Sequence, residues 1–235
     1  MTTDVDRIPT YVRGLDQKLQ GGVPRGSIVL VSGHAGSMKS SFVYSLLWHA
    51  NAEHKLKSVY VTMEQTKEHI LQHMALMGMK ERTSEEMLLI DLTRLRKEAE
   101  KSTKKDTNWT DAILQSVQKY QTNYGADLFA LDSLQALYAL QNFDNPRNEL
   151  FKFFDALRET KLTTFLISEM PTDRFVFGQF GIEDFLCDGI MHLKVEHGKR
   201  SSNLFVGVLK LRKTNHQKGY FPLLYEKNAF EIVTD

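Results

Sequence analysis

The residues with the clearest chemical meaning lie where an apolar run, Val29 to Val31, meets a glycine-containing turn that ends in Lys-Ser. The turn consists of Gly33, His34, Ala35, Gly36, Ser37, Met38, Lys39, Ser40 and Ser41. A strand, such a turn and a helix in this order hold phosphate, because backbone N–H groups at a helix N-terminus attract anions. The pattern predicts that Lys39 contacts the β- and γ-phosphates of a nucleoside triphosphate and that the Ser40 hydroxyl binds Mg²⁺.

One position departs from this pattern. The usual spacing, G-x-x-x-x-G-K-S/T, has glycine directly before the lysine, and this chain has Met38 there. Glycine at this point lets the backbone come close to a ligand, and a side chain takes up that space. The loop can tolerate Met38 if φ there is negative, at some cost in affinity. An ordinary strand–turn–helix remains the alternative interpretation.

Two acidic residues follow apolar runs in the same way. Asp132 ends the run 128–131, and Glu64 follows residues 58–63. Since parallel strands end at one edge of a sheet, where ligands bind, both carboxylates are expected near the turn. Asp132 is the candidate for supporting Mg²⁺, with a helix-capping aspartate as the alternative. Glu64 is the candidate for orienting an attacking water, and a surface glutamate at a helix start is an equal alternative.

Composition places the chain among globular proteins. Its 235 residues are 42% hydrophobic, and a net charge of +1 gives no argument for nucleic acid or a membrane surface. Cys187 is the single cysteine, so an internal disulfide is excluded. Without a signal-like N-terminus or a run long enough to span a membrane, the expected location is the cytoplasm. We expect one domain over residues 1–235, with residues 1–20 packing on its core.

Strands and helices are expected to alternate through the first 170 residues. The expected strands are 27–32, 58–63, 87–90, 127–131 and 162–167. Four helices are expected: one directly after the turn that ends at Ser41, one over 66–77, one over 111–120 and one that begins at Pro146. Residues 91–107 are predicted to be a mobile surface excursion. Four later strands follow closely, at 189–195, 204–211, 221–225 and 229–233. The sequence therefore predicts an α/β fold: a mostly parallel twisted sheet with helices on both faces and antiparallel strands at its C-terminal end.

Apolar spacing predicts which helix faces are buried. After the turn, the buried face is Phe42, Val43, Leu46, Leu47 and Ala50. After Pro146 it is Leu150, Phe151, Phe154 and Leu157.

Several further segments, in chain order, carry a resemblance to a known family. They are Arg13-Gly14-Leu15-Asp16 with Gly21-Gly22-Val23-Pro24-Arg25-Gly26-Ser27, then Val61-Thr62-Met63-Glu64-Gln65, Leu131-Asp132-Ser133-Leu134, residues 181–190, and Leu209-Lys210-Leu211-Arg212-Lys213-Thr214-Asn215-His216. Together with the turn they resemble the RecA-like ATPases with a P-loop NTPase core, and within them the KaiC-like family. The likeness covers residues 8–233.

The resemblance implies ATP and Mg²⁺ as ligands and Glu64 as the catalytic carboxylate. It also implies a ring, often a hexamer, with ATP at subunit interfaces. Lys210, Arg212 and His216 would then reach the nucleotide bound by a neighbour, although a solvated basic loop is the commoner fate of such residues. Gln65 replaces the second glutamate of the family's pair. With Met38, this leads us to expect slow hydrolysis and a nucleotide-dependent regulatory or signalling oligomer.

Other functions remain open at this stage. One is a recombinase paralogue that binds DNA, which the nearly neutral charge does not favour. Another is a scaffold that binds ATP without hydrolysing it. The protein partner is not identified. A basic stretch at 94–105 is expected to be a solvated face, and His69 with His73 is not expected to hold a metal.

Overall fold

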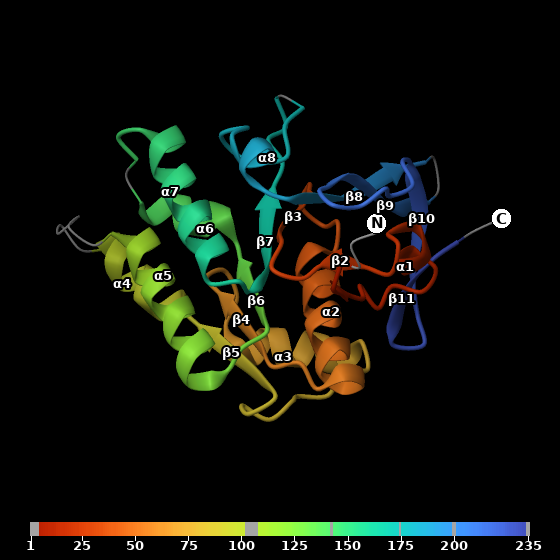
Figure 1. Cartoon of the computed structure of the whole chain (residues 1–235), viewed down its shortest axis with the longest axis horizontal. Helices are drawn as coiled ribbons and strands as arrows, with labels where there is room; N and C mark the ends of the chain where they lie inside the picture. The colour runs from red at the N-terminus through yellow and green to blue at the C-terminus, as the bar shows by residue number, and fades with distance from the viewer. Residues whose placement is uncertain (1–4, 102–107, 142, 174, 199–200, 234–235) are drawn as a thin grey trace.

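A nine-stranded sheet forms the centre of the computed structural model, which describes residues 5–101, 108–141, 143–173, 175–198 and 201–233. The strand order is β11-β10-β9-β8-β3-β7-β6-β4-β5 (Figure 1). The parallel strands are β3 (Ile28–Gly33), β4 (Ser58–Thr62), β5 (Met87–Asp91), β6 (Leu128–Asp132), β7 (Thr163–Glu169) and β8 (Gly189–His197). The antiparallel ones are β9 (Ser202–Leu211), β10 (Tyr220–Glu226) and β11 (Ala229–Ile232). The predicted sheet class is confirmed.

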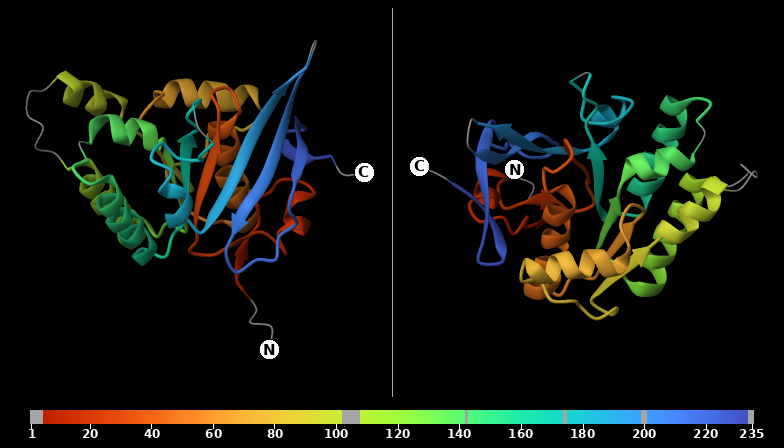
Figure 2. Two further views of the ribbon diagram at one scale, coloured as in Figure 1. Left: turned by 90° about the horizontal axis from the view of Figure 1, so that it is seen from above. Right: turned by 180° about the vertical axis from the view of Figure 1, so that it is seen from behind.

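Helices cover both faces of the sheet, because its central strands are apolar on both sides. In β3, Val29 and Val31 pack on one side, with α2 (Lys39–His54) and α3 (Lys67–Leu76). Ile28 and Leu30 pack on the other, with the helices that follow β5. These are α5 (Trp109–Lys119), α6 (Leu134–Leu140) and α7 (Pro146–Glu159). A π-helical turn at Tyr120–Tyr124 extends α5. The two groups of helices lie on opposite sides of the sheet (Figures 1 and 2).

The N-terminal segment packs against the first of these faces. It contains β1 (Arg7–Ile8), α1 (Leu15–Lys18) and β2 (Val23–Pro24), and its apolar side chains are buried in the same cluster as α2. Backbone hydrogen bonds at 2.9 and 3.0 Å join Arg13 to Phe230 and Ile232 of β11. Gly22 has a φ of +128°, and a Cβ there would lie 2.2 Å from the Ile8 carbonyl oxygen, so only glycine fits.

The prediction of a mobile excursion at 91–107 is wrong for the described part, which forms α4 (Thr93–Lys101). Asp91 accepts hydrogen bonds from the Thr93 N–H and hydroxyl at 2.7 and 2.6 Å, and Arg94 pairs with Glu98 one turn on. Charged residues with straight side chains are good helix formers, so high charge did not indicate irregular structure. Residues 102–107 lie outside the described residues.

The predicted buried face of α7 is wrong at one position. Phe151 is 55% exposed, whereas Phe153 is buried beside Phe154. The other predicted residues, Leu150 and Leu157, are buried. Residue 151 lies only one step, about 100° around the helix, from residue 150, which turns it toward solvent, whereas 153, 154 and 157 share the face of 150.

Three short helices were not predicted from the sequence: α1, α6 and α8 (Glu183–Leu186). Among the described residues, no helix combines the length and the apolar character needed to cross a membrane.

Candidate functional site

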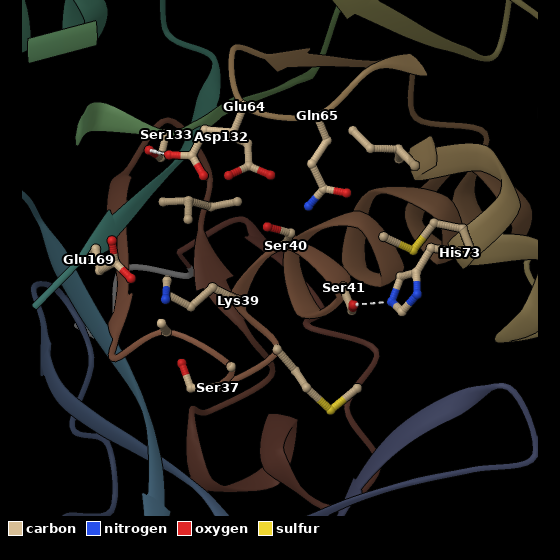
Figure 3. Close-up of a pocket in the computed structure, with 16 residues that line it drawn as sticks. Ser37, Lys39, Ser40, Ser41, Glu64, Gln65, His73, Asp132, Ser133 and Glu169 are labelled. Atoms are coloured by element: carbon tan, nitrogen blue, oxygen red, sulfur yellow. Dashed lines mark hydrogen bonds between the residues drawn. The ribbon is translucent and has the colours of Figure 1, made fainter. Parts of the chain in front are cut away.

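A pocket of about 410 Å³ lies at the carboxyl edge of the parallel strands. Residues 35–41 line it, together with Glu64 and Gln65 after β4, Asp132 and Ser133 at the end of β6, and Glu169 at the end of β7. In Figure 3, Lys39, Ser40 and three carboxylates, those of Glu64, Asp132 and Glu169, point toward the same space. Residues that are far apart in the sequence meet here because parallel strands end at one edge.

The two glycines of the loop between β3 and α2 are needed for different reasons, close packing at Gly33 and backbone conformation at Gly36. A Cβ on Gly33 would lie 2.3 Å from the Leu193 carbonyl oxygen and 2.5 Å from the Ser37 hydroxyl, so the loop leaves β3 only with glycine there. Gly36 has a φ of +79°, in the left-handed region. Gly33 and His34 do not line the pocket, but the His34 carbonyl accepts a hydrogen bond from Lys39.

Lys39 begins α2 and carries the positive charge of the pocket. Its Nζ donates to the His34 carbonyl oxygen at 2.8 Å. Burial lowers the pKa of Lys39, and the carboxylates of Glu169, Asp132 and Glu64 act in the opposite direction. One ammonium group therefore faces three acidic groups. Such a pocket favours an anion only when a cation binds together with it.

Met38 adopts a left-handed conformation, with a φ of +62°. The condition of a negative φ is therefore not met. Met38 immediately precedes α2, and its carbonyl accepts the Phe42 N–H at 2.9 Å, so the turn into the helix fixes this conformation. Glycine adopts it freely, whereas a residue with a Cβ loses about 1–2 kcal/mol. The cost of Met38 thus lies in backbone strain as well as in the space its side chain fills.

Asp132 is buried, with 3% of its surface exposed, and accepts a hydrogen bond from the Tyr60 hydroxyl at 2.6 Å. Burial raises the pKa of Asp132, and hydrogen bonds from Tyr60 and Ser40 oppose that shift. It does not cap α6, because the Ser133 hydroxyl does so by accepting the Ala136 N–H at 3.3 Å. This evidence goes against the helix-cap alternative for Asp132. A buried carboxylate beside a serine hydroxyl is a pair of oxygen ligands that suits Mg²⁺.

Glu64 lies outside the next helix. That helix, α3, begins at Lys67 with Thr66 as its N-terminal cap, which goes against the interpretation of Glu64 as a helix-start residue. The Glu64 carboxylate instead accepts a hydrogen bond from the Ser133 hydroxyl. Ser133 thereby connects the segment after β4 to the end of β6 and holds the carboxylate on the pocket side.

Sequence reasoning missed three side chains of this site. Glu169 ends β7 as Asp132 ends β6, so the same strand-end rule could have found it. Tyr60 is buried within β4, and only the three-dimensional contact with Asp132 reveals its part. His73 of α3 lines the pocket, and its Nε2 lies 3.1 Å from the Ser41 hydroxyl oxygen.

Lys210, Arg212 and His216 do not line this pocket. Lys210 donates to the carbonyl oxygens of Asp184 and Cys187 at 2.9 and 2.6 Å. The guanidinium of Arg212 bonds Asp188 at 3.0 Å. Asp188 also accepts the Ile28 N–H at the amino end of β3, the end opposite the phosphate loop. Within one chain, Lys210 and Arg212 therefore lie at the far edge of the sheet from the pocket.

Comparison with known proteins identifies the family. The family described as "ATPase: KaiC" matches residues 8–235, nearly the whole chain. The chain belongs to the KaiC ATPase family. Its core is accordingly RecA-like, and the KaiC-like protein PH0186 from Pyrococcus horikoshii shares this fold, with a TM-score of 0.83 and 22% identity over 98% of this chain and 100% of that one.

Curated relatives of this KaiC-family chain include longer clock proteins. It is 27% identical to the circadian clock oscillator protein KaiC of Picosynechococcus and covers 44% of it, with 97% of its own length aligned. It is 30% identical to KaiC of Prochlorococcus marinus strain SARG, with 93% of this chain and 44% of the relative aligned. The chain thus spans about half the length of the curated relatives it matches.

Replacing Tyr60 with phenylalanine is expected to raise the Mg²⁺ concentration needed for ATP binding by about tenfold. The ring still fills the core, but Asp132 loses a hydrogen bond to its charged form, which is worth about 1.5–3 kcal/mol. A Mg²⁺ titration at fixed ATP measures this. Tyr225→Phe, which removes a hydroxyl bonded to the Met77 carbonyl oxygen outside the pocket, is the matched control. An unchanged Mg²⁺ requirement in Tyr60→Phe would show that this hydroxyl does not support the Asp132 carboxylate.

Asp132→Asn is expected to raise the melting temperature of the nucleotide-free protein at pH 8 by about 2–4 °C, the equivalent of about 1 kcal/mol for a chain of this size. Because the pKa of Asp132 is raised in the folded state, folding disfavours its ionised form. The contribution of Asp132 to the stability of the wild type increases as the pH falls through that raised pKa. The difference in melting temperature between Asp132→Asn and the wild type therefore shrinks toward pH 4. Thermal unfolding at both pH values checks this, with the exposed Asp155→Asn as control. A lower melting temperature for Asp132→Asn at pH 8 would contradict it.

Proposed function

We propose that this KaiC-family chain binds ATP with Mg²⁺ in the pocket at the carboxyl edge of the sheet and hydrolyses it slowly. The observation that carries the proposal is the convergence of Lys39, Asp132 and Glu64, from three separate segments of the chain, on one cavity lined by the phosphate loop. Within it, Lys39 and the loop N–H groups bind phosphate, while Ser40 and Asp132 hold Mg²⁺. The ion neutralises charge on the phosphate oxygens. This neutralisation is needed because the pocket holds more carboxylates than ammonium groups.

Glu64 is proposed to orient and polarise the attacking water. Its hydrogen bond with Ser133 fixes the carboxylate at the pocket, and Gln65 beside it lines the same cavity without adding a second base. Since an amide does not accept a proton at neutral pH, Gln65 cannot assist Glu64 as a second base. Gln65 and the strained Met38 are the reasons for proposing slow turnover.

The same proposal includes assembly, with residues 1–235 forming one ATPase domain of a cytoplasmic ring, taken to be a hexamer with ATP at its subunit interfaces. The positions of Lys210 and Arg212 support this, because they lie at the opposite edge of the sheet from the chain's own phosphate loop. A cation at that edge can reach a nucleotide only on another copy, where it would stabilise charge on the transferring phosphoryl group. His216, which follows in the same segment, is proposed to face that nucleotide too. The nucleotide state of such a ring would regulate contacts with a protein partner.

Solution mass, measured with and without ATP and Mg²⁺ and paired with phosphate release, tests this proposal. We expect nucleotide-dependent assembly together with slow release of phosphate. Assembly without phosphate release would favour a scaffold that does not hydrolyse ATP. Salt-sensitive binding of single-stranded DNA would favour a recombinase paralogue, because neutralised phosphates release counterions.

A further inference from the structure

We propose that Met38 is a reversible oxidation site and that its sulfoxide closes the phosphate loop to ATP. The second half of this inference rests on the proposed function. Met38 combines three properties that are independent of one another: its exposure, its place in the pocket and its place at the start of α2.

Exposure sets Met38 apart from the other methionines. Its surface is 36% exposed, whereas six others, Met63, Met74, Met79, Met87, Met170 and Met191, are between 0% and 5% exposed. Met77 is partly buried against the core, and Met1 lies outside the described residues. Because peroxide oxidises thioethers according to their access to solvent, Met38 is the described methionine that should react first.

The location of Met38 gives its oxidation a consequence. Its side chain lines the pocket that contains Lys39 and the start of α2. Met38 precedes the first turn of α2 and makes no side-chain cap hydrogen bond. The first N–H groups of a helix have no partner within it, and these are the donors that a phosphate uses. A sulfoxide oxygen is a strong acceptor, and in this proposal the oxidised Met38 competes with phosphate for these N–H groups.

The chemistry requires a peroxide and nothing else. The sulfur lone pair attacks one oxygen of hydrogen peroxide, the O–O bond breaks, and an S–O bond forms. The sulfur is oxidised by two electrons, and the second oxygen leaves as water with both protons. Thiol-dependent methionine sulfoxide reductases reverse the step, so the site can return to its first state.

Peptide mass spectrometry after limited peroxide treatment of the folded chain tests the site. Trypsin releases residues 26–39, with Met38 as their one methionine, and residues 58–67, with Met63 as theirs. We expect residues 26–39 to gain an oxygen about tenfold faster than residues 58–67, because oxidation follows exposure. The two fragments should react equally in urea. Saturating ATP with Mg²⁺ should slow the oxidation of residues 26–39 alone.

Affinity measurements test the consequence. Oxidised wild type is expected to bind ATP about tenfold more weakly, the size of one lost charge-assisted hydrogen bond, and reductase treatment should restore binding. Met38→Leu has no sulfur at this position and should bind ATP equally before and after peroxide. Met77→Leu should behave as wild type.

Equal oxidation of the two fragments in the folded chain would overturn the proposal, as would unchanged ATP affinity after oxidation of Met38. A loss of affinity in peroxide-treated Met38→Leu as large as in wild type would also overturn it. If untreated protein binds no ATP while residues 26–39 are still oxidised selectively, the proposed function is wrong and the oxidation site itself stands.

Discussion

Replacing Lys39 with alanine is expected to weaken ATP binding about 100-fold, since a charge-assisted hydrogen bond to phosphate in a partly buried site contributes about 1.5–3 kcal/mol. Lys39 is the cation of the pocket lining, and it faces the carboxylates of Glu64, Asp132 and Glu169. Its loss leaves the phosphates beside acidic groups without a compensating charge. Displacement of a fluorescent ATP analogue measures the change.

The fold should survive this substitution. Burial lowers the pKa of Lys39, so folding disfavours its charge, and its ammonium contacts the chain through the His34 carbonyl. We therefore expect the melting temperature of Lys39→Ala to equal or exceed that of wild type. Lys119→Ala, at the end of α5 away from the pocket, is the matched control and should bind ATP normally. Equal ATP affinity in Lys39→Ala and wild type would contradict the assignment of the loop.

Glu64→Gln is expected to lower the rate of ATP hydrolysis about 100- to 1,000-fold, within the range for a lost general base. ATP affinity should change less than twofold. The amide oxygen can still accept the hydrogen bond from Ser133, so the side chain keeps its position and loses only its basicity. Single-turnover phosphate release, with ATP affinity measured in parallel, separates these two effects.

Two further variants sharpen this prediction. Ser133→Ala keeps the Glu64 carboxylate but removes its hydrogen bond, and it should slow hydrolysis less than Glu64→Gln does. Gln65→Glu adds a second carboxylate and should accelerate hydrolysis. Phosphate release from Glu64→Gln at the wild-type rate would show that another group activates the water, and Glu169 at the end of β7 would be the next residue to substitute.

Apolar runs, their spacing and the turn residues between them were enough to predict the sheet and to bring several residues of the candidate site together. Buried strands are short apolar runs, and the residue after each run must lie at the carboxyl edge, which is how Glu64 and Asp132 were placed near Lys39. The start of α7 at Pro146 was also predicted, and in the structure the Asn145 side chain caps this helix by accepting the Asn148 N–H.

The remaining features depend on contacts that no local pattern contains. Tyr60 looks like any core residue until the fold brings its hydroxyl to Asp132. The conformation of Met38 is decided by the turn into α2, and the general preference of side chains for a negative φ does not predict it. In α4, charge was mistaken for irregular structure, although the same residues favour a helix.

Calorimetric titration of ATP into the wild-type chain at saturating Mg²⁺ tests the central claim most directly. The account predicts saturable heat of binding with one site per chain, and much weaker binding when Mg²⁺ is removed, because three carboxylates face the single ammonium of Lys39 in this pocket. No heat of binding for ATP under these conditions would mean that the loop with Met38 in its left-handed conformation does not accept a triphosphate, and the proposed function would be wrong.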